Sequence, residues 1–271
     1  MNPDVQIDLY AVLNLLGVVQ GLLLAYFFTN RNHRQIPSNL YTGLLLLSAS
    51  ILSFDSFLGY TNYMFRVIRL NDFSEPLAFL IGPYFYFYVY SKLTNQKPGK
   101  TIYHYLPAIL YFIYMIPFHV ADESIKYNAY INAYHPDLEF QKMGDGLNFT
   151  DFLGLHDHVN ELIVLSLICY VFLAFRIYLQ KRQSVDQKTQ NFVRISLIFF
   201  SSIILLFFLV KLFFIHDLGD FIINSATAIT IYSISIRLIG QSLGFKGSSE
   251  KYKKSALDQD YKDRLLKKIT R

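Results

Sequence analysis

The chain has 271 residues, of which 53% are apolar and 17% are charged. Soluble domains contain about 45–50% apolar and about 25% charged residues, so both values favour a membrane protein. Aromatic residues reach 17%, which excludes a disordered chain, and the single cysteine excludes a secreted scaffold held together by internal disulfides.

Seven apolar stretches are long enough to cross a bilayer as helices, which takes about 17–25 residues. They cover residues 9–29, 40–60, 77–93, 102–120, 162–179, 195–215 and 221–239. Inside lipid the backbone must form its hydrogen bonds within the segment, which favours helices. The sequence therefore predicts an all-α polytopic membrane protein with seven transmembrane helices.

The distribution of lysine and arginine predicts the orientation. Residues 30–39, 92–101, 176–194 and the chain from Arg237 onward hold 20 of the 25 basic residues. Short cytoplasmic loops carry an excess of Lys and Arg. We therefore expect the N-terminus outside, the C-terminus in the cytoplasm, and a multi-pass protein of the bacterial inner membrane.

The composition divides the chain into two parts. Residues 1–240 form the predicted transmembrane domain, in which the one long outer connection is residues 121–160. Residues 241–271 begin with a Gly- and Ser-rich connector and continue as an amphipathic cytoplasmic helix. We interpret this helix as leading to an effector domain outside the sequence; the alternative is a basic tail on the inner leaflet.

Several local motifs occur in an order that resembles the seven-helix membrane module of AraC-type transcription regulators in Bacteroidetes-like bacteria. The motifs are Gly17-x-x-Gln20-Gly21-Leu22, Asn39-Leu40, Gly82-Pro83-x-x-Tyr86-x-Tyr88, Lys92-Leu93-Thr94, His104-Tyr105-Leu106-Pro107 and Lys251-Tyr252-Lys253-Lys254-Ser255-x-Leu257. The resemblance implies a helix-turn-helix domain that would contact DNA, and this chain contains none of that domain.

Ionisable and polar groups within spans are the leading candidates for a ligand site, because they are costly in lipid unless paired or hydrated. Asp55 and Lys211 lie at matching depths with opposite charge, which favours a pair, although each side chain could instead reach the outer headgroups separately. The further candidates for binding a periplasmic or membrane ligand are Glu161, His119 and Asn224.

The first span carries a packing motif. Gly17 and Gly21 form a small-xxx-small pattern that allows another helix to approach, and Asn14 and Gln20 can hydrogen-bond across the contact. The resemblance also implies a homodimer, for which this glycine face offers a contact.

The sequence predicts no catalytic residue, no metal site and no cofactor. Five histidines fall on the outer side, at positions 119, 135, 156, 158 and 216. With Asp157 and Glu161 nearby they could bind a divalent metal or sense pH, but we favour solvated loop residues, because His-x-His with neither a third nearby His nor a Cys is a weak metal signal. Phosphate-binding, nucleophile-elbow and zinc-protease motifs do not occur, so an enzyme is not expected.

We interpret the chain as the sensory module of a one-component transcription regulator, with the lipid bilayer as its surroundings and a ligand still unidentified. A stand-alone transporter is the alternative from a different class, although the internal repeat expected of one is missing. A receptor front-end of a histidine kinase would look identical within these residues.

Overall fold

The computed structural model describes residues 3–144, 146–214, 219 and 221–232, and within these ranges every regular element is helical. The long helices are α1 (Leu9–Thr29), α2 (Pro37–Tyr60), α3 (Glu75–Thr94), α4 (Ile102–Val120), α5 (Glu123–Tyr134), α6 (Val159–Lys181) and α7 (Gln187–Phe213), and the short ones are η1 (Tyr63–Arg66), η2 (Ile68–Leu70) and η3 (Arg182–Ser184). The last helix in the described part of the chain covers Phe221–Tyr232. The all-α prediction is confirmed.

Local signals explain where several helices begin. Asp8 and Asp186 cap α1 and α7, because each carboxylate accepts a hydrogen bond from a backbone N–H in the first turn. Pro37 opens α2, where the missing N–H costs nothing. The cap at Asp186 also corrects the predicted span 195–215, since α7 begins eight residues earlier with polar residues that hydropathy does not detect.

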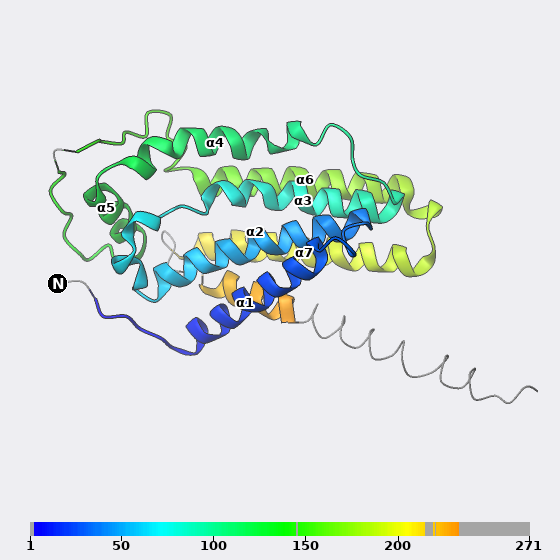
Figure 1. The fold of residues 1–271 in the computed structure, drawn as a ribbon, viewed down its shortest axis with the longest axis horizontal. Coiled ribbons are helices and arrows are strands. Elements are labelled where there is room, and N and C mark those ends of the chain that lie inside the picture. Colours follow the sequence, from blue (N-terminus) through cyan, green and yellow to red (C-terminus); the bar gives the residue numbers. More distant parts are fainter. Residues whose placement is uncertain (1–2, 145, 215–218, 220, 233–271) are drawn as a thin grey trace, which may run out of the picture. The chain divides into compact units, whose positions relative to one another are not determined.

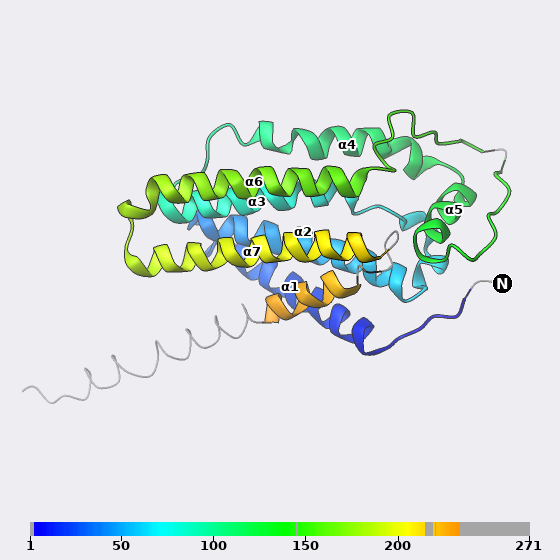
Figure 2. The same ribbon diagram turned by 180° about the vertical axis from the view of Figure 1, so that it is seen from behind.

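The long helices run alternately up and down. In Figure 1 the connections α1–α2, α3–α4 and α6–α7 lie at one end of the described bundle, and the connection α2–α3 and helix α5 lie at the other. The same alternation is visible from behind in Figure 2. The connections at the first end contain Arg31, Arg34, Lys97, Lys100 and Arg182, so we call it the basic end and the other the α5 end.

Helix α3 occupies the centre of the bundle. It packs extensively on α2 and α6 and also contacts α4 and α7. Phe85, Val89 and Leu93 of α3 form a buried cluster with residues of α6 and α7. Gly82 allows close approach to α6, because a Cβ placed on it would lie 2.8 Å from Tyr170 Cδ2. Next to this contact, Pro83 interrupts the hydrogen-bond ladder of α3.

The outer surfaces of α1, α4, α6 and α7 carry many exposed apolar side chains. On α4 the exposed side chains include Leu106, Leu110, Ile113 and Ile116. Within the described residues, four helices are long and apolar enough to cross a membrane, namely α1, α2, α6 extended through η3, and α7 to Val210. A fifth candidate is α4 together with α5, which are bent by 114° at the break between them. The structure thus supports a membrane protein with four to five such helices, and seven spans remain a prediction.

The α5 end is closed by helix α5 and the 3-10 turns. Tyr130 and Ile131 of α5 are almost fully buried against Leu58 and Met64. The Tyr130 hydroxyl donates a 2.7 Å hydrogen bond to the carbonyl of Gly59, at the end of α2. The predicted end of the last span at residue 239 and the predicted connector and helix over 241–271 lie outside the described residues.

Candidate ligand site

Two carboxylates and an imidazole meet at the α5 end of the bundle. Asp72 precedes α3, Glu75 lies in its first turn, and His156 belongs to the loop before α6. One ligand atom from each of the three lies within 4.8 Å of the others. His156 Nε2 is 3.3 Å from Asp72 Oδ2. We call these residues the acid–histidine cluster.

Neighbouring side chains hold the two carboxylates in place. Asn71 Nδ2 donates a 2.6 Å hydrogen bond to Asp72 Oδ2. The Tyr111 hydroxyl of α4 donates a 2.6 Å hydrogen bond to Glu75 Oε2. Hydrogen bonds from both a loop and a second helix therefore fix where the carboxylate oxygens lie.

A third carboxylate, Asp151, organises the loop that carries His156. Its Oδ2 accepts the backbone N–H groups of His156, at 3.1 Å, and Asp157, at 2.9 Å. Its Oδ1 accepts the hydroxyl of Tyr114 on α4. The pKa of Asp151 stays below its usual value, because these hydrogen bonds outweigh the opposing effect of burial.

The cluster is shielded from water on one side by aromatic rings. The His156 ring lies 5.1 Å from Phe118 and 5.9 Å from Phe149, measured between ring centroids. Only 19% of the His156 side chain and 26% of the Asp72 side chain are exposed. Burial disfavours protonation of His156, but the hydrogen bond to Asp72 and the charges of Asp72, Asp151 and Asp157 raise its pKa above the ordinary value.

The cluster is also connected to α2. Ser74, which lies between Asp72 and Glu75, donates a 2.6 Å hydrogen bond from its hydroxyl to Asp55 Oδ2. Residue 72 adopts a left-handed backbone conformation, with φ of 62°, which is uncommon for a residue other than glycine. The turn that enters α3 is thus held by contacts to α2, to α4 and to the loop before α6.

Two of the sequence-predicted ligand residues lie near this cluster. Asp55 contacts Ser74, and the backbone carbonyl of His119 accepts a 2.6 Å hydrogen bond from Lys126 Nζ. His119 follows Phe118, whose ring centroid lies 5.1 Å from that of His156. The structure therefore brings both residues to the α5 end, beside the acid–histidine cluster.

The other three predicted ligand residues lie elsewhere or cannot be placed. Glu161 is 71% exposed and lies 3.9 Å from His158. Asn224 is buried in the Phe221–Tyr232 helix. The backbone of Lys211 belongs to α7, but its side chain lies outside the described part, so the proposed pair with Asp55 stays a prediction.

The polar and small residues of α1 lie against neighbouring helices of the same chain. Asn14 Nδ2 donates a 3.2 Å hydrogen bond to the carbonyl of Ser53 on α2. A Cβ placed on Gly21 would lie 2.1 Å from Ser50 Oγ, and one on Gly17 would lie 2.5 Å from Cβ of Ala228. Gln20 is half-buried. The glycine face that we considered for a dimer is therefore occupied by α2 and the Phe221–Tyr232 helix.

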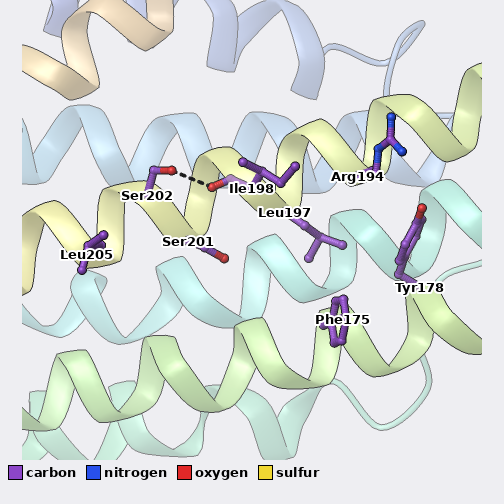
Figure 3. A pocket seen from close by; sticks show the side chains of 8 residues that line it. All are labelled: Phe175, Tyr178, Arg194, Leu197, Ile198, Ser201, Ser202 and Leu205. Carbon is purple, nitrogen blue, oxygen red and sulfur yellow. Dashed lines mark hydrogen bonds between the residues drawn. The ribbon is translucent and has the colours of Figure 1, made fainter.

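A groove lies between α6 and α7, away from the acid–histidine cluster (Figure 3). Its volume is about 380 Å³, and its lining is mostly apolar, with Arg194 as the one charged lining residue. The Ser202 hydroxyl is already used within α7, because it donates a 2.9 Å hydrogen bond to the carbonyl of Ile198. Such a surface suits a lipid chain, whereas the acid–histidine cluster offers convergent polar groups.

Sequence reasoning did not single out Asp72, Glu75, Asp151, Tyr111 or Tyr114. Asp72 and His156 are separated by more than eighty positions, and no spacing rule connects them. An acidic residue followed by proline, as in Glu75-Pro76, is also an ordinary helix start. The useful signal was the polar loop of residues 121–160, which is long for a loop without regular structure.

The fold and the site together define an all-helical protein with apolar helices suited to a membrane and a polar cluster at one end. Comparison with protein-family models, curated proteins and solved structures found no match.

Proposed function

We propose that the chain is the membrane-embedded sensory module of a one-component transcription regulator of the AraC type, with the acid–histidine cluster as its sensing site. The observation that carries the proposal is the position of this cluster. It joins the start of α3, the middle of α4 and the loop before α6 at the end of the bundle opposite the basic connections.

The proposed topology has seven spans, with the α5 end in the periplasm and the basic end in the cytoplasm of the inner membrane. Support comes from the alternation of the helices and from the basic residues gathered at one end. Helix α3 is not among the helices long and apolar enough to cross a membrane by themselves, but it is surrounded by other helices and needs little contact with lipid.

A ligand can shift the module only by binding one helix arrangement better than another. In the proposed mechanism, a ligand at the cluster draws the start of α3 toward the loop that carries His156. Movement of α3 is then transmitted to α6 and α7, because its cytoplasmic half is packed on both through Phe85, Val89 and Leu93.

The signal leaves the bundle through the Phe221–Tyr232 helix. Ala228 and Ile231 of the Phe221–Tyr232 helix pack against Gly17 and Gly21 of α1, and α1 in turn packs along α2. A change in the bundle therefore alters the support of the last helix, and with it the segment that leads to the effector. DNA would be contacted only by that effector.

The test is a comparison of transcripts in the native host. We expect chromosomal His156→Gln and Asp72→Asn variants to change the same set of genes as deletion of the whole gene. The matched control is His158→Gln, since His158 is 72% exposed and two residues away. Unchanged transcripts in the cluster variants, at normal protein levels, would refute the proposal.

The two alternative classes, a transporter and a histidine kinase, predict different results. A transporter would give solute flux in proteoliposomes that contain only this protein, without a direct transcriptional role. A histidine kinase would transfer phosphate from ATP to a histidine of the full-length protein. Immunoblotting for the chain in the native host, followed by mass measurement, would show whether an effector domain is attached.

A further inference from the structure

We infer that Asp72, Glu75 and His156 form a binding site for a divalent transition-metal ion. The inference rests on the proposed function for its physiological meaning, because it names the chemical class of the ligand that the sensing site takes. The site itself is argued from the geometry of the cluster.

The donor set matches such an ion in type and spacing. Carboxylate oxygens and an imidazole nitrogen bind Zn²⁺ at about 2.0–2.2 Å, so two ligand atoms in a tetrahedral site lie about 3.3–3.6 Å apart. His156 Nε2 and Asp72 Oδ2 are 3.3 Å apart. The whole set lies within 4.8 Å, so the remaining ligand needs to move by little more than 1 Å.

The imidazole decides between classes of cation. Mg²⁺ and Ca²⁺ prefer sites made of oxygen ligands, whereas imidazole suits first-row transition metals and Zn²⁺. Three protein ligands also leave a coordination position open for water, as in zinc sites that exchange a ligand. A reversible site of this kind suits a sensor better than a closed structural site does.

The surroundings support the ligand atoms as the outer shell of a metal site does. Asn71 donates to Asp72, and Tyr111 donates to Glu75, so both carboxylates are oriented before any ion binds. Phe118 and Phe149 flank the His156 ring. These rings lower the local dielectric, which strengthens the attraction between two carboxylates and a dication.

A second group, Asp151, His156 and Asp157, also falls within 4.8 Å. The oxygens of Asp151 already accept the Tyr114 hydroxyl and two backbone N–H groups. Asp157 is exposed. Asp151 is therefore a positioning residue for the loop, and the ion belongs on the Asp72 side of His156.

The direct test uses the full chain in detergent, stripped with EDTA and titrated with Zn²⁺ by calorimetry. We expect one Zn²⁺ per chain, with affinity at least about tenfold weaker in Asp72→Asn, Glu75→Gln and His156→Gln. His158→Gln should bind within about twofold of the wild type. Absence of saturable binding in the wild type, or equal losses in the His158 and His156 variants, would overturn the inference.

A measurement on the wild type alone guards against variants that fail to fold. Pulsed electron paramagnetic resonance of the chain loaded with one equivalent of Cu²⁺, a paramagnetic ion that imidazole suits, should show coupling to one histidine nitrogen. Coupling to no nitrogen, or to several, would overturn the assignment of the site.

The metal site and the regulator function can be refuted independently of each other. If Zn²⁺ binds as expected but transcripts do not depend on the cluster, the regulator function is wrong and the metal site stands. If transcripts depend on the cluster but neither Zn²⁺ nor Cu²⁺ binds, the sensing site takes another ligand and the metal inference is wrong.

Discussion

Gly17 of α1 and Ala228 of the Phe221–Tyr232 helix meet so closely that a Cβ added to Gly17 would lie 2.5 Å from the Cβ of Ala228. Real Cβ contacts are essentially never so short, so Ala228 fills the space that a side chain at position 17 would need. The contact fixes the last described helix on the first one, although the two are separated by about two hundred residues in sequence.

This contact predicts the effect of one added methyl group. Gly17→Ala should destabilise the protein by about 1–3 kcal/mol, because overpacking forces the two helices apart. The measurement is thermal unfolding in detergent. Gly99→Ala is the matched control, since a Cβ there would meet nothing within 4 Å. Adding Ala228→Gly should restore part of the loss in the double variant, and additive losses would contradict the contact.

The cap of α1 predicts a pH dependence. The pKa of Asp8 lies below its ordinary value of 3.8, because the Tyr60 hydroxyl and the backbone N–H of Ala11 donate hydrogen bonds to the carboxylate. The carboxylate therefore stabilises the fold above pH 3.8, and this stabilisation is lost as the pH falls through the lower pKa of the folded state.

Asp8→Ala should therefore cost about 1 kcal/mol near pH 7, as loss of an N-cap does. The difference from the wild type should shrink as the pH falls below about 4. Unfolding by denaturant at several pH values measures this. In Asp8→Asn a capping oxygen remains without a charge, so a pH-dependent difference between Asp8→Asn and Asp8→Ala would contradict the explanation.

We expect Tyr114 to keep the loop that carries His156 in a fixed conformation. Its hydroxyl donates to Asp151 and accepts the backbone N–H of Leu153 at 3.2 Å. Tyr114→Phe removes a hydrogen bond to a charged group, worth about 1.5–3 kcal/mol. Amide exchange at residues 151–157 should then accelerate about tenfold or more. Tyr103→Phe, at a strongly exposed ring of the same helix, should leave exchange there unchanged.

The proposed orientation can be tested with single cysteines. Cys169 is the only cysteine, so a Cys169→Ser background allows one label at a time. An impermeant maleimide should label Leu153→Cys from the periplasmic side of spheroplasts. Lys97→Cys, in the α3–α4 connection, should react only after the membrane is permeabilised. The reverse pattern would place the α5 end in the cytoplasm.

Much of the helical framework could be predicted from the sequence, because apolar runs mark lipid-facing and buried helices alike. The predicted ranges 9–29 and 102–120 coincide with α1 and α4. The predicted span 195–215 begins eight residues after the start of α7. Polar residues after Asp186 continue the helix beyond its apolar part. Hydropathy therefore defines the apolar portion of a helix rather than its ends.

The acid–histidine cluster could not be predicted, for a different physical reason. Asp72 and His156 lie in connections and Glu75 in the first turn of α3, so the distances between them depend on how α3 and α6 pack, which local patterns do not encode. Asp55 was singled out because a charge within a span is costly, and it does lie next to the cluster through Ser74. Asp72, outside any span, gave no comparable signal.

The proline within α3 has a mechanical consequence. At 1.5 Å per residue, Pro83 divides α3 into an arm of roughly 12 Å toward Glu75 and one of roughly 17 Å toward Thr94. The close contact of Gly82 with Tyr170 holds α3 against α6 beside Pro83, so α3 would pivot at this point. A pull on Glu75 would then move the opposite end of α3 in the other direction, by a slightly larger distance.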